Sequence, residues 1–126
     1  MNFPNDLKYS KSDEWVRPAT GEAGISDYAQ NHLSDIVYVE LPEVGAEFKQ
    51  GTPFGSIESV KAASDMNLPA SGTLTAVNES LADTPEVVNS DPYGKGWIVK
   101  FTLGDPAELG GLMDAAAYEA YCNERG

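Results

Sequence analysis

Apolar and polar residues alternate along most of the chain with a period of two, which is the side-chain period of a β-strand. β-branched and aromatic residues gather in short runs, and turn residues separate these runs. Six or seven short strands at this close spacing predict a small barrel or sandwich. The runs that predict strands are Glu14–Arg17, Ile36–Glu40, Phe54–Val60, Ala62–Leu68, Thr73–Val77 and Trp97–Thr102.

Helix signals are confined to a few places, where a residue that can cap a helix stands before a helix-compatible stretch. The last of these stretches is rich in alanine and predicts a helix near the C-terminus. The predicted starts are Ser26 before residues 27–33, Thr84 before a brief helix that ends ahead of Asn89, Asp105 before Pro106, and Asp114 before Ala115–Cys122.

Two segments of the chain share the pattern Leu-Pro-x-x-Gly, namely Leu41–Gly45 and Leu68–Gly72. Such an echo is expected where two similar halves of a domain pack face to face. A coincidence between two turns would give the same pattern. The sequence leaves both interpretations open.

The composition narrows the possible partners. The 126 residues are enough for one domain, which we expect to span residues 1–126. They include 20 Asp and Glu against 8 Lys and Arg, a formal net charge of −12, which argues against binding nucleic acid or an anionic membrane surface. Hydrophobic residues make up 41%, enough for a core, but no apolar run approaches the roughly 18 residues that cross a bilayer.

The beginning of the chain, Met1–Asp6, has neither the basic and apolar regions of a secretory signal nor the Arg-rich character of a transit peptide. The one cysteine, Cys122, has no partner for an internal disulfide. We therefore expect a protein of a reducing compartment, most simply a prokaryotic cytoplasm. A mature mitochondrial form would have the same features.

Common catalytic motifs are missing from the sequence, which has no Gly-x-Ser-x-Gly elbow, no Gly-rich phosphate loop and no His-x-x-x-His pair. Lys61 stands out instead, because it is the one basic residue between positions 50 and 94 and separates two predicted strands. A lysine at a hairpin tip suits a covalent swinging arm. It equally suits a solvated turn that discourages edge-to-edge aggregation, and spacing alone favours this second interpretation.

The segment Glu58–Asp65 resembles the lipoyl-attachment segment of the H-protein family of the glycine cleavage system. The family has a mainly β fold, a flattened lipoyl/biotinyl-type barrel-sandwich of two small antiparallel sheets with short helices and a C-terminal helix. The resemblance therefore implies that fold here. Further segments resemble the family in the same order, namely Tyr9–Lys11 with Glu14 and Trp15, Gly24–Gln30 (the family's first helix), Asp35–Gly45, Pro69–Gly72, Val77–Asn78, Pro85–Asn89, Asp91–Gly94 and Gly96–Trp97.

The resemblance implies a carrier without catalytic activity of its own. Lipoate attached to Lys61, by a lipoate ligase or a lipoyl/octanoyl transferase, would accept an aminomethyl group from glycine decarboxylase (P protein). The arm would deliver that group to the aminomethyltransferase (T protein) and be reoxidised by dihydrolipoamide dehydrogenase (L protein). The family also implies a monomer.

In this family the loaded arm folds into a cleft on the carrier, which shields it from water. The resemblance implies that Glu14 and Asp65 hold the cationic amine and that Ser12 and His32 add hydrogen bonds. A plainer interpretation is that Asp65 caps the end of a strand and that His32 closes a helix. No metal site is expected, because His32 is the only histidine, Cys122 lies near the end of the chain and the spacing of the carboxylates singles out no pair.

The sequence departs from the family pattern at three places. Asp13 stands where the family usually has histidine, and Ser34 replaces a frequent glycine. The segment Val16–Ala23 is about two residues shorter than usual, so the hairpin before Gly24 is expected to be clipped. None of these departures touches the segment around Lys61.

Other functions remain as alternatives. Biotin carriers generally have methionine on both sides of the lysine, where this chain has Val60 and Ala62, and lipoyl domains of oxo-acid dehydrogenases favour Asp before it. A relay role, passing lipoyl groups to other carriers, would keep the fold and Lys61. From other classes, a small hydrolase would use His32 with a carboxylate, and an acidic interaction module would use no cofactor.

Overall fold

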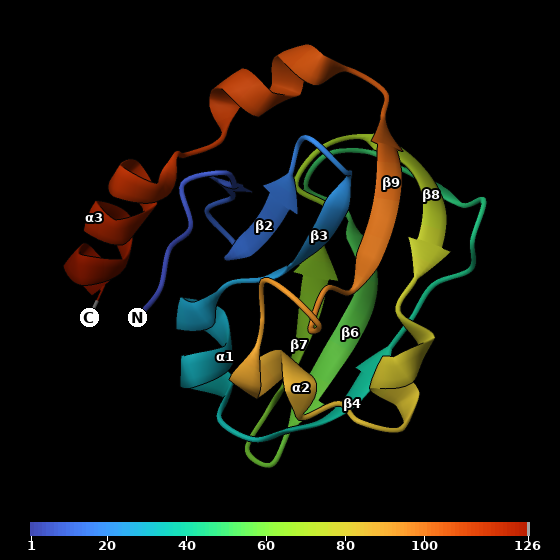
Figure 1. Cartoon of the computed structure of the whole chain (residues 1–126), viewed down its shortest axis with the longest axis vertical. Coiled ribbons are helices and arrows are strands. Elements are labelled where there is room, and N and C mark those ends of the chain that lie inside the picture. The colour runs from blue at the N-terminus through green and yellow to red at the C-terminus, as the bar shows by residue number, and fades with distance from the viewer. Residues whose placement is uncertain (126) are drawn as a thin grey trace.

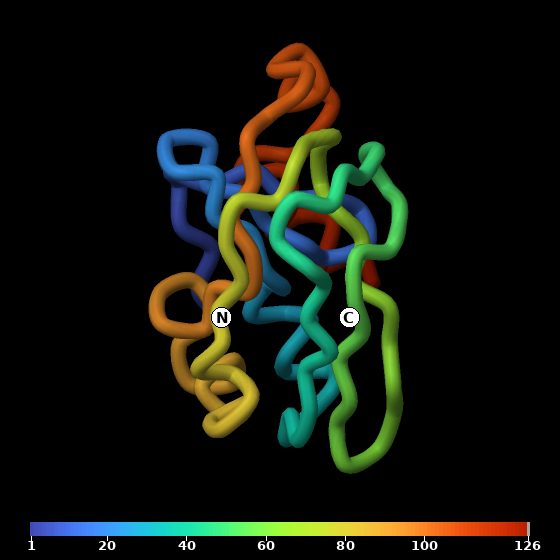
Figure 2. The backbone as a smooth tube through the Cα atoms, turned by 90° about the vertical axis from the view of Figure 1, so that its right-hand side faces the viewer, coloured from blue at the N-terminus to red at the C-terminus, as the bar shows by residue number. Residues whose placement is uncertain are grey.

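Two antiparallel sheets pack against each other in the computed structural model, which describes residues 1–125 (Figures 1 and 2). The larger sheet has the strand order β1-β2-β3-β9-β8-β5 and the smaller has the order β4-β6-β7. The strands are β1 (Lys8–Tyr9), β2 (Glu14–Arg17), β3 (Glu22–Ile25), β4 (Ile36–Glu40), β5 (Glu47–Phe48), β6 (Pro53–Ser59), β7 (Ala63–Asn67), β8 (Gly72–Val77) and β9 (Val99–Leu103).

The helices are short and lie at the margins of the sheets, with the last one beside the N-terminal segment (Figure 1). The predicted mainly β, two-sheet fold with short helices and a C-terminal helix is confirmed. The helices are α1 (Asp27–Leu33), α2 (Val87–Ser90) and α3 (Ala115–Arg125), with 3₁₀ helices η1 (Glu79–Ala82) and η2 (Pro106–Gly111).

The strand count of six or seven was too low, because the described residues form nine strands. Two of the strands that the alternation missed, β1 and β5, are only two residues long, although the resemblance placed one of the family's opening strands at Tyr9–Lys11. The third, β3, holds Gly24 and Ile25, which the resemblance assigned to the first helix. β9 begins at Val99 rather than Trp97, so the predicted strand start was also wrong.

The predicted helix starts hold where a side chain caps the backbone. Ser26 accepts a hydrogen bond from the Ala29 amide at 3.1 Å and begins α1 as expected. The brief helix after Thr84 begins later than predicted, at Val87, without a side-chain cap. Asp105 does cap the chain after it, but the product is the 3₁₀ helix η2.

The core has two parts. Apolar residues from both sheets, such as Val16, Ile57 and Phe101, form the main cluster between the sheets. A second, aromatic cluster lies under α3, where the rings of Tyr9 and Tyr118 stack at a centroid distance of 4.6 Å. This second cluster joins the beginning of the chain to its last helix.

The two Leu-Pro-x-x-Gly segments make corresponding crossings between the sheets. Leu41–Gly45 leads from β4 to β5 and Leu68–Gly72 leads from β7 to β8, each time from the smaller sheet to the larger. The receiving strands pair with each other. The two glycines differ in purpose, since Gly45 has a φ of +95° whereas a Cβ on Gly72 would lie 2.1 Å from the Thr102 carbonyl oxygen.

Two of the departures from the family have local structural outcomes. The β2–β3 hairpin is closed by a short turn at residues 18–21, with Arg17 paired in register with Glu22. Ser34 ends α1 with φ 66° and ψ −149°, a conformation that favours glycine. The frequent glycine of the family at this position therefore has a backbone reason.

Candidate carrier site

The β6–β7 hairpin extends beyond the other elements at the lower end of the molecule and carries Lys61 at its tip (Figures 1 and 2). Lys61 is exposed, and within residues 1–125 its amine has no hydrogen bond or ion pair. The Ser59 hydroxyl organises the turn by accepting hydrogen bonds from the amides of Lys61 at 3.3 Å and Ala62 at 3.1 Å. A fixed turn thus presents a free lysine side chain to solvent.

The four residues expected to form a cleft line one cavity of about 290 Å³. They reach it from different elements. Ser12 and Glu14 come from the turn before β2 and from its first residue, His32 from α1, and Asp65 from β7. Asp65 follows Lys61 by four residues along the hairpin, so their Cα atoms are at most about 13 Å apart.

Glu14 is the most unusual of the four, because its carboxyl is almost fully buried. One oxygen accepts hydrogen bonds from the hydroxyls of Ser12 and Ser10, and the other accepts one from the Asn67 amide at 3.1 Å. Within residues 1–125, no lysine or arginine lies within ion-pair distance of it. Burial raises the pKa of Glu14 to about 7, against the opposing effect of these hydrogen bonds.

Asp65 and His32 both border the cavity, Asp65 from β7 and His32 from α1. Asp65 lies in the middle of β7, opposite Ser56, so the alternative that it caps a strand end was wrong. His32 does lie in the last turn of α1, and its ring packs on Tyr28 with the centroids 4.1 Å apart. His32 therefore both lies at the end of the helix and lines the cavity, so the two interpretations of this residue are compatible.

Two charged residues at the cavity were missed as site residues, Asp13 and Arg125. The Arg125 guanidinium donates to both carboxylate oxygens of Asp13, at 2.6 and 3.1 Å. Asp13 was noted only as a departure from the family pattern, and nothing in the sequence pairs it with a residue 112 positions away. The pairing of Asp13 with Arg125 becomes visible only in the fold.

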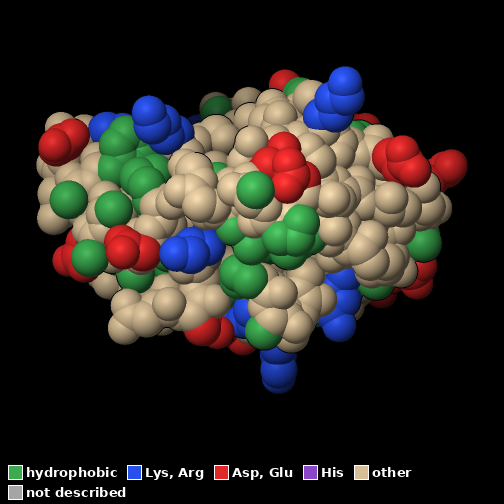
Figure 3. All heavy atoms as spheres, turned by 90° about the horizontal axis from the view of Figure 1, so that it is seen from above, with side chains coloured by type: hydrophobic (Ala, Val, Ile, Leu, Met, Phe, Trp, Pro, Cys, Tyr) green, Lys and Arg blue, Asp and Glu red, His purple; other side chains and the backbone are tan. Residues whose placement is uncertain are grey.

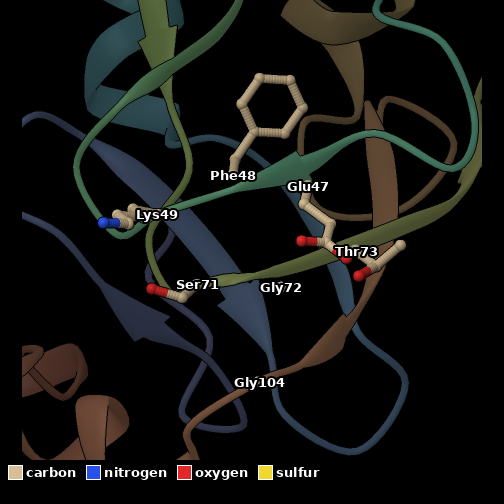
Figure 4. A pocket seen from close by; sticks show the side chains of 7 residues that line it. All are labelled: Glu47, Phe48, Lys49, Ser71, Gly72, Thr73 and Gly104. Atoms are coloured by element: carbon tan, nitrogen blue, oxygen red, sulfur yellow. The ribbon is translucent and has the colours of Figure 1, made fainter.

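A larger hollow of about 440 Å³ lies elsewhere, where β5 pairs with β8 (Figure 4). The paired Glu47 and Thr73 side chains lie next to each other there, and the Phe48 ring points away from them (Figure 4). None of the four expected cleft residues borders this hollow. The smaller cavity is therefore singled out by the residues that line it and not by its volume.

The structure was also searched for metal-binding groups and for membrane-spanning helices. In residues 1–125 no group of three or more His, Cys, Asp or Glu side chains is arranged to hold a metal ion. The same residues contain no helix that is long and apolar enough to cross a membrane.

A two-sheet β fold that presents a lysine at an exposed hairpin tip, beside a carboxylate-lined cavity, has the architecture of a carrier domain with a covalent arm. The glycine cleavage H-protein family matches residues 7–125. The chain belongs to that family.

Individual relatives agree with this assignment. The glycine cleavage system H protein of Symbiobacterium thermophilum is 54% identical over 98% of both chains. The mitochondrial H protein 2 of Arabidopsis thaliana is 52% identical over 94% of this chain and 78% of its own length. The crystal structure of a Mycobacterium marinum H protein superposes with a TM-score of 0.82, at 33% identity, over 98% of this chain and 99% of that one.

Family membership fixes the general role. The protein is the lipoyl-carrying shuttle of the glycine cleavage system and a carrier without catalytic activity of its own. Members of the family carry lipoate on a lysine, which confirms the predicted cofactor. The role in that system implies its P, T and L proteins as partners.

Proposed function

We propose that Lys61 is the lysine that carries the lipoyl group. Its exposure, its freedom from other contacts and its place on the tip between β6 and β7 support this assignment. The neighbouring side chains Val60 and Ala62 are also exposed, so an enzyme that attaches lipoate has access to the whole tip. We propose a lipoate ligase or a lipoyl/octanoyl transferase for that step.

The cavity beside the hairpin is proposed to receive the amine of the loaded arm. The observation that carries this proposal is the buried Glu14 carboxyl, which has hydrogen-bond donors but no cation. A cationic amine would supply the missing charge, with Asp65 as the second carboxylate. Ser12 and His32 would complete the polar wall, while Leu33 and Ile57 on the apolar wall exclude water.

The distribution of charge supports transient docking to basic partner surfaces. Seven of the eight Lys and Arg lie outside residues 50–94, leaving Lys61 as the one basic residue in that segment. The end of the molecule opposite the hairpin tip shows Lys and Arg side chains among the acidic ones (Figure 3). Attraction of the acidic carrier speeds encounter, and salt screens it, so delivery to the partner enzymes slows as ionic strength rises.

The proposal covers the remaining expectations as well. The chain acts as one carrier domain over residues 1–126, as a monomer, in a prokaryotic cytoplasm. Attachment of the lipoyl group at Lys61 removes one positive charge.

Intact-mass measurement of protein made in lipoate-supplied cells tests Lys61 as the attachment site. The lipoyl increment is expected on the native chain and absent from Lys61→Arg, and an increment that persists in this variant would assign another residue.

The cavity is tested by the half-life of the loaded arm in water, followed by intact-mass spectrometry. Glu14→Gln and Asp65→Asn each shorten it, because the amide cannot balance the charge of the amine. Glu108→Gln is the matched control, because Glu108 also accepts bonds from the Ser71 amide and hydroxyl but lies away from the cavity. Equal half-lives for all three variants and the native chain would contradict the proposal.

A further inference from the structure

The Arg125 guanidinium forms part of the wall of the cavity that Glu14 lines, although it comes from the last turn of α3. Its central carbon lies 4.3 Å from the ring centroid of Tyr28 and 4.0 Å from that of Tyr121. Stacking on aromatic rings and the two hydrogen bonds to Asp13 hold this guanidinium in one place.

A guanidinium in this position is a potential competitor for the amine. Arginine stays protonated at every physiological pH, and its planar group pairs readily with carboxylates. Glu14 and Asp65 line the same cavity as Arg125. An unpaired Arg125 side chain would turn toward them and place a permanent positive charge where the amine of the arm has to bind.

Asp13 is built to prevent this. Its backbone has a φ of 78°, a left-handed conformation that Asp and Asn tolerate better than most residues. Its carboxylate also accepts a hydrogen bond from the Tyr118 hydroxyl at 2.8 Å, and that hydroxyl lies 2.6 Å from the hydroxyl of Ser26. The backbone carbonyl of Asp13 accepts a further bond from the Ser26 amide at 2.9 Å. The Asp13 carboxylate is thus held in place by contacts other than its pair with Arg125.

Resting on the proposed function of the cavity, we propose that Asp13 is a positioning residue for the carrier reaction. By pairing with Arg125 it neutralises that guanidinium, holds it against the aromatic rings and keeps the two acceptor carboxylates free for the cationic amine. The departure from the family pattern at position 13 and the arginine at position 125 act as one unit in this chain.

The test is a two-residue cycle of variants, Asp13→Asn, Arg125→Met and both together, with the half-life of the loaded arm as the first readout. Asn preserves the left-handed backbone and an acceptor for Tyr118, so folding is retained. Asp13→Asn frees Arg125 and is expected to shorten the half-life about fivefold, the effect of one poorly screened charge. Removing Arg125 as well restores most of the half-life.

A second readout uses the protein without lipoyl. The Glu14 carboxyl is titrated by NMR, in a cavity where it faces Asp13, Asp65, His32 and Arg125. The pKa of Glu14 is expected to be lower in Asp13→Asn than in the double variant, because these two differ only by the freed guanidinium. Native protein and Arg125→Met differ less, since the guanidinium that this variant removes is held on Asp13 and away from Glu14.

The matched control is Asp6→Asn, which breaks the pair between Asp6 and Arg17, an arginine that also lies over an aromatic ring, that of Trp15. It leaves both readouts unchanged. A double variant that is no better than Asp13→Asn in half-life, with equal pKa values for Glu14, overturns the inference and leaves Asp13 a purely structural role. If Glu14→Gln leaves the half-life unchanged, the cavity proposal fails instead, and the titration still decides whether Asp13 restrains Arg125.

Discussion

The hairpin tip and the cavity are built in opposite ways. The tip consists of one exposed turn, fixed by the Ser59 hydroxyl, and the Lys61 amine makes no hydrogen bond or ion pair within residues 1–125. The cavity is assembled from the turn before β2, from α1, β7 and α3, and three of its charged groups are buried or paired, namely Glu14, Asp13 and Arg125. A carrier needs both, because an arm has to move freely whereas its resting place has to be formed in advance.

The largest expected difference between the two regions is in stability. Tyr118→Ala removes a fully buried ring that stacks on Tyr9 and should lower the free energy of unfolding by about 4 kcal/mol. Val60→Ala at the tip should change it by less than about 0.5 kcal/mol. Urea unfolding followed by fluorescence measures both. Similar losses for the two variants would contradict the contrast.

A smaller effect concerns Glu14 and pH. Its folded pKa of about 7 exceeds the ordinary 4.5, so the folded state binds the proton more tightly and stability falls as pH rises from about 4.5 to 7. The penalty above pH 7 amounts to about 3 kcal/mol. Glu14→Gln should remove this part of the pH dependence in chemical unfolding between pH 5 and 8. A native profile that is already flat would show that Glu14 titrates normally.

Ser59→Ala tests how the tip is held. The hydroxyl accepts two amide hydrogen bonds and donates to the Ala62 carbonyl, so its loss should cost about 1.5 kcal/mol and slow the attachment of lipoate. Ser56→Ala is the control, because Ser56 lies on the same strand as Ser59 and its hydroxyl makes one long hydrogen bond, to the Glu40 carboxylate of β4. Unfolding curves and the rate of mass gain are the measurements. Equal behaviour of the two variants would argue against a fixed turn.

The smallest effect lies in the link between the two regions. Ser34 connects α1, on the cavity wall, to Asp35, whose carbonyl accepts a hydrogen bond from Val60 beside the tip. Ser34→Gly relieves its positive φ and should raise the free energy of unfolding by about 1 kcal/mol. The melting temperature rises accordingly, whereas Ser80→Gly, in a 3₁₀ helix, should lower it.

The sequence predicted the strands that alternate clearly, such as Ile36–Glu40, and the helix capped by Ser26. It did not predict β1 and β5, because two-residue strands are defined by their partners and not by a pattern of their own. It also placed the start of β9 two residues early, since Trp97 and Ile98 are apolar but lie before the strand, although the Ile98 amide donates to the Ala23 carbonyl of β3. Sequence patterns therefore predict the strands and helices whose own residues carry the signal, and miss those that depend on a distant partner strand.

The candidate site shows the same limit. Lys61 was visible as an isolated base, and the resemblance supplied Ser12, Glu14, His32 and Asp65. The burial of Glu14 was not visible, because it depends on how β7 and the turn before β2 close over it. Nor was the pairing of position 13 with position 125, which requires α3 to pack on the N-terminal strands.

The packing of α3 against the turn before β2 also sets an order of events during synthesis. The hairpin with Lys61 lies in the middle of the chain and emerges from the ribosome well before Arg125 does. Under the proposed role of the cavity, a chain that still lacks residues 115–125 has the lysine for the arm but not the complete wall around the loaded amine. A protein truncated within α3 would thus accept lipoate but lose the carried group to hydrolysis. Protection of that group would then require the complete C-terminal helix.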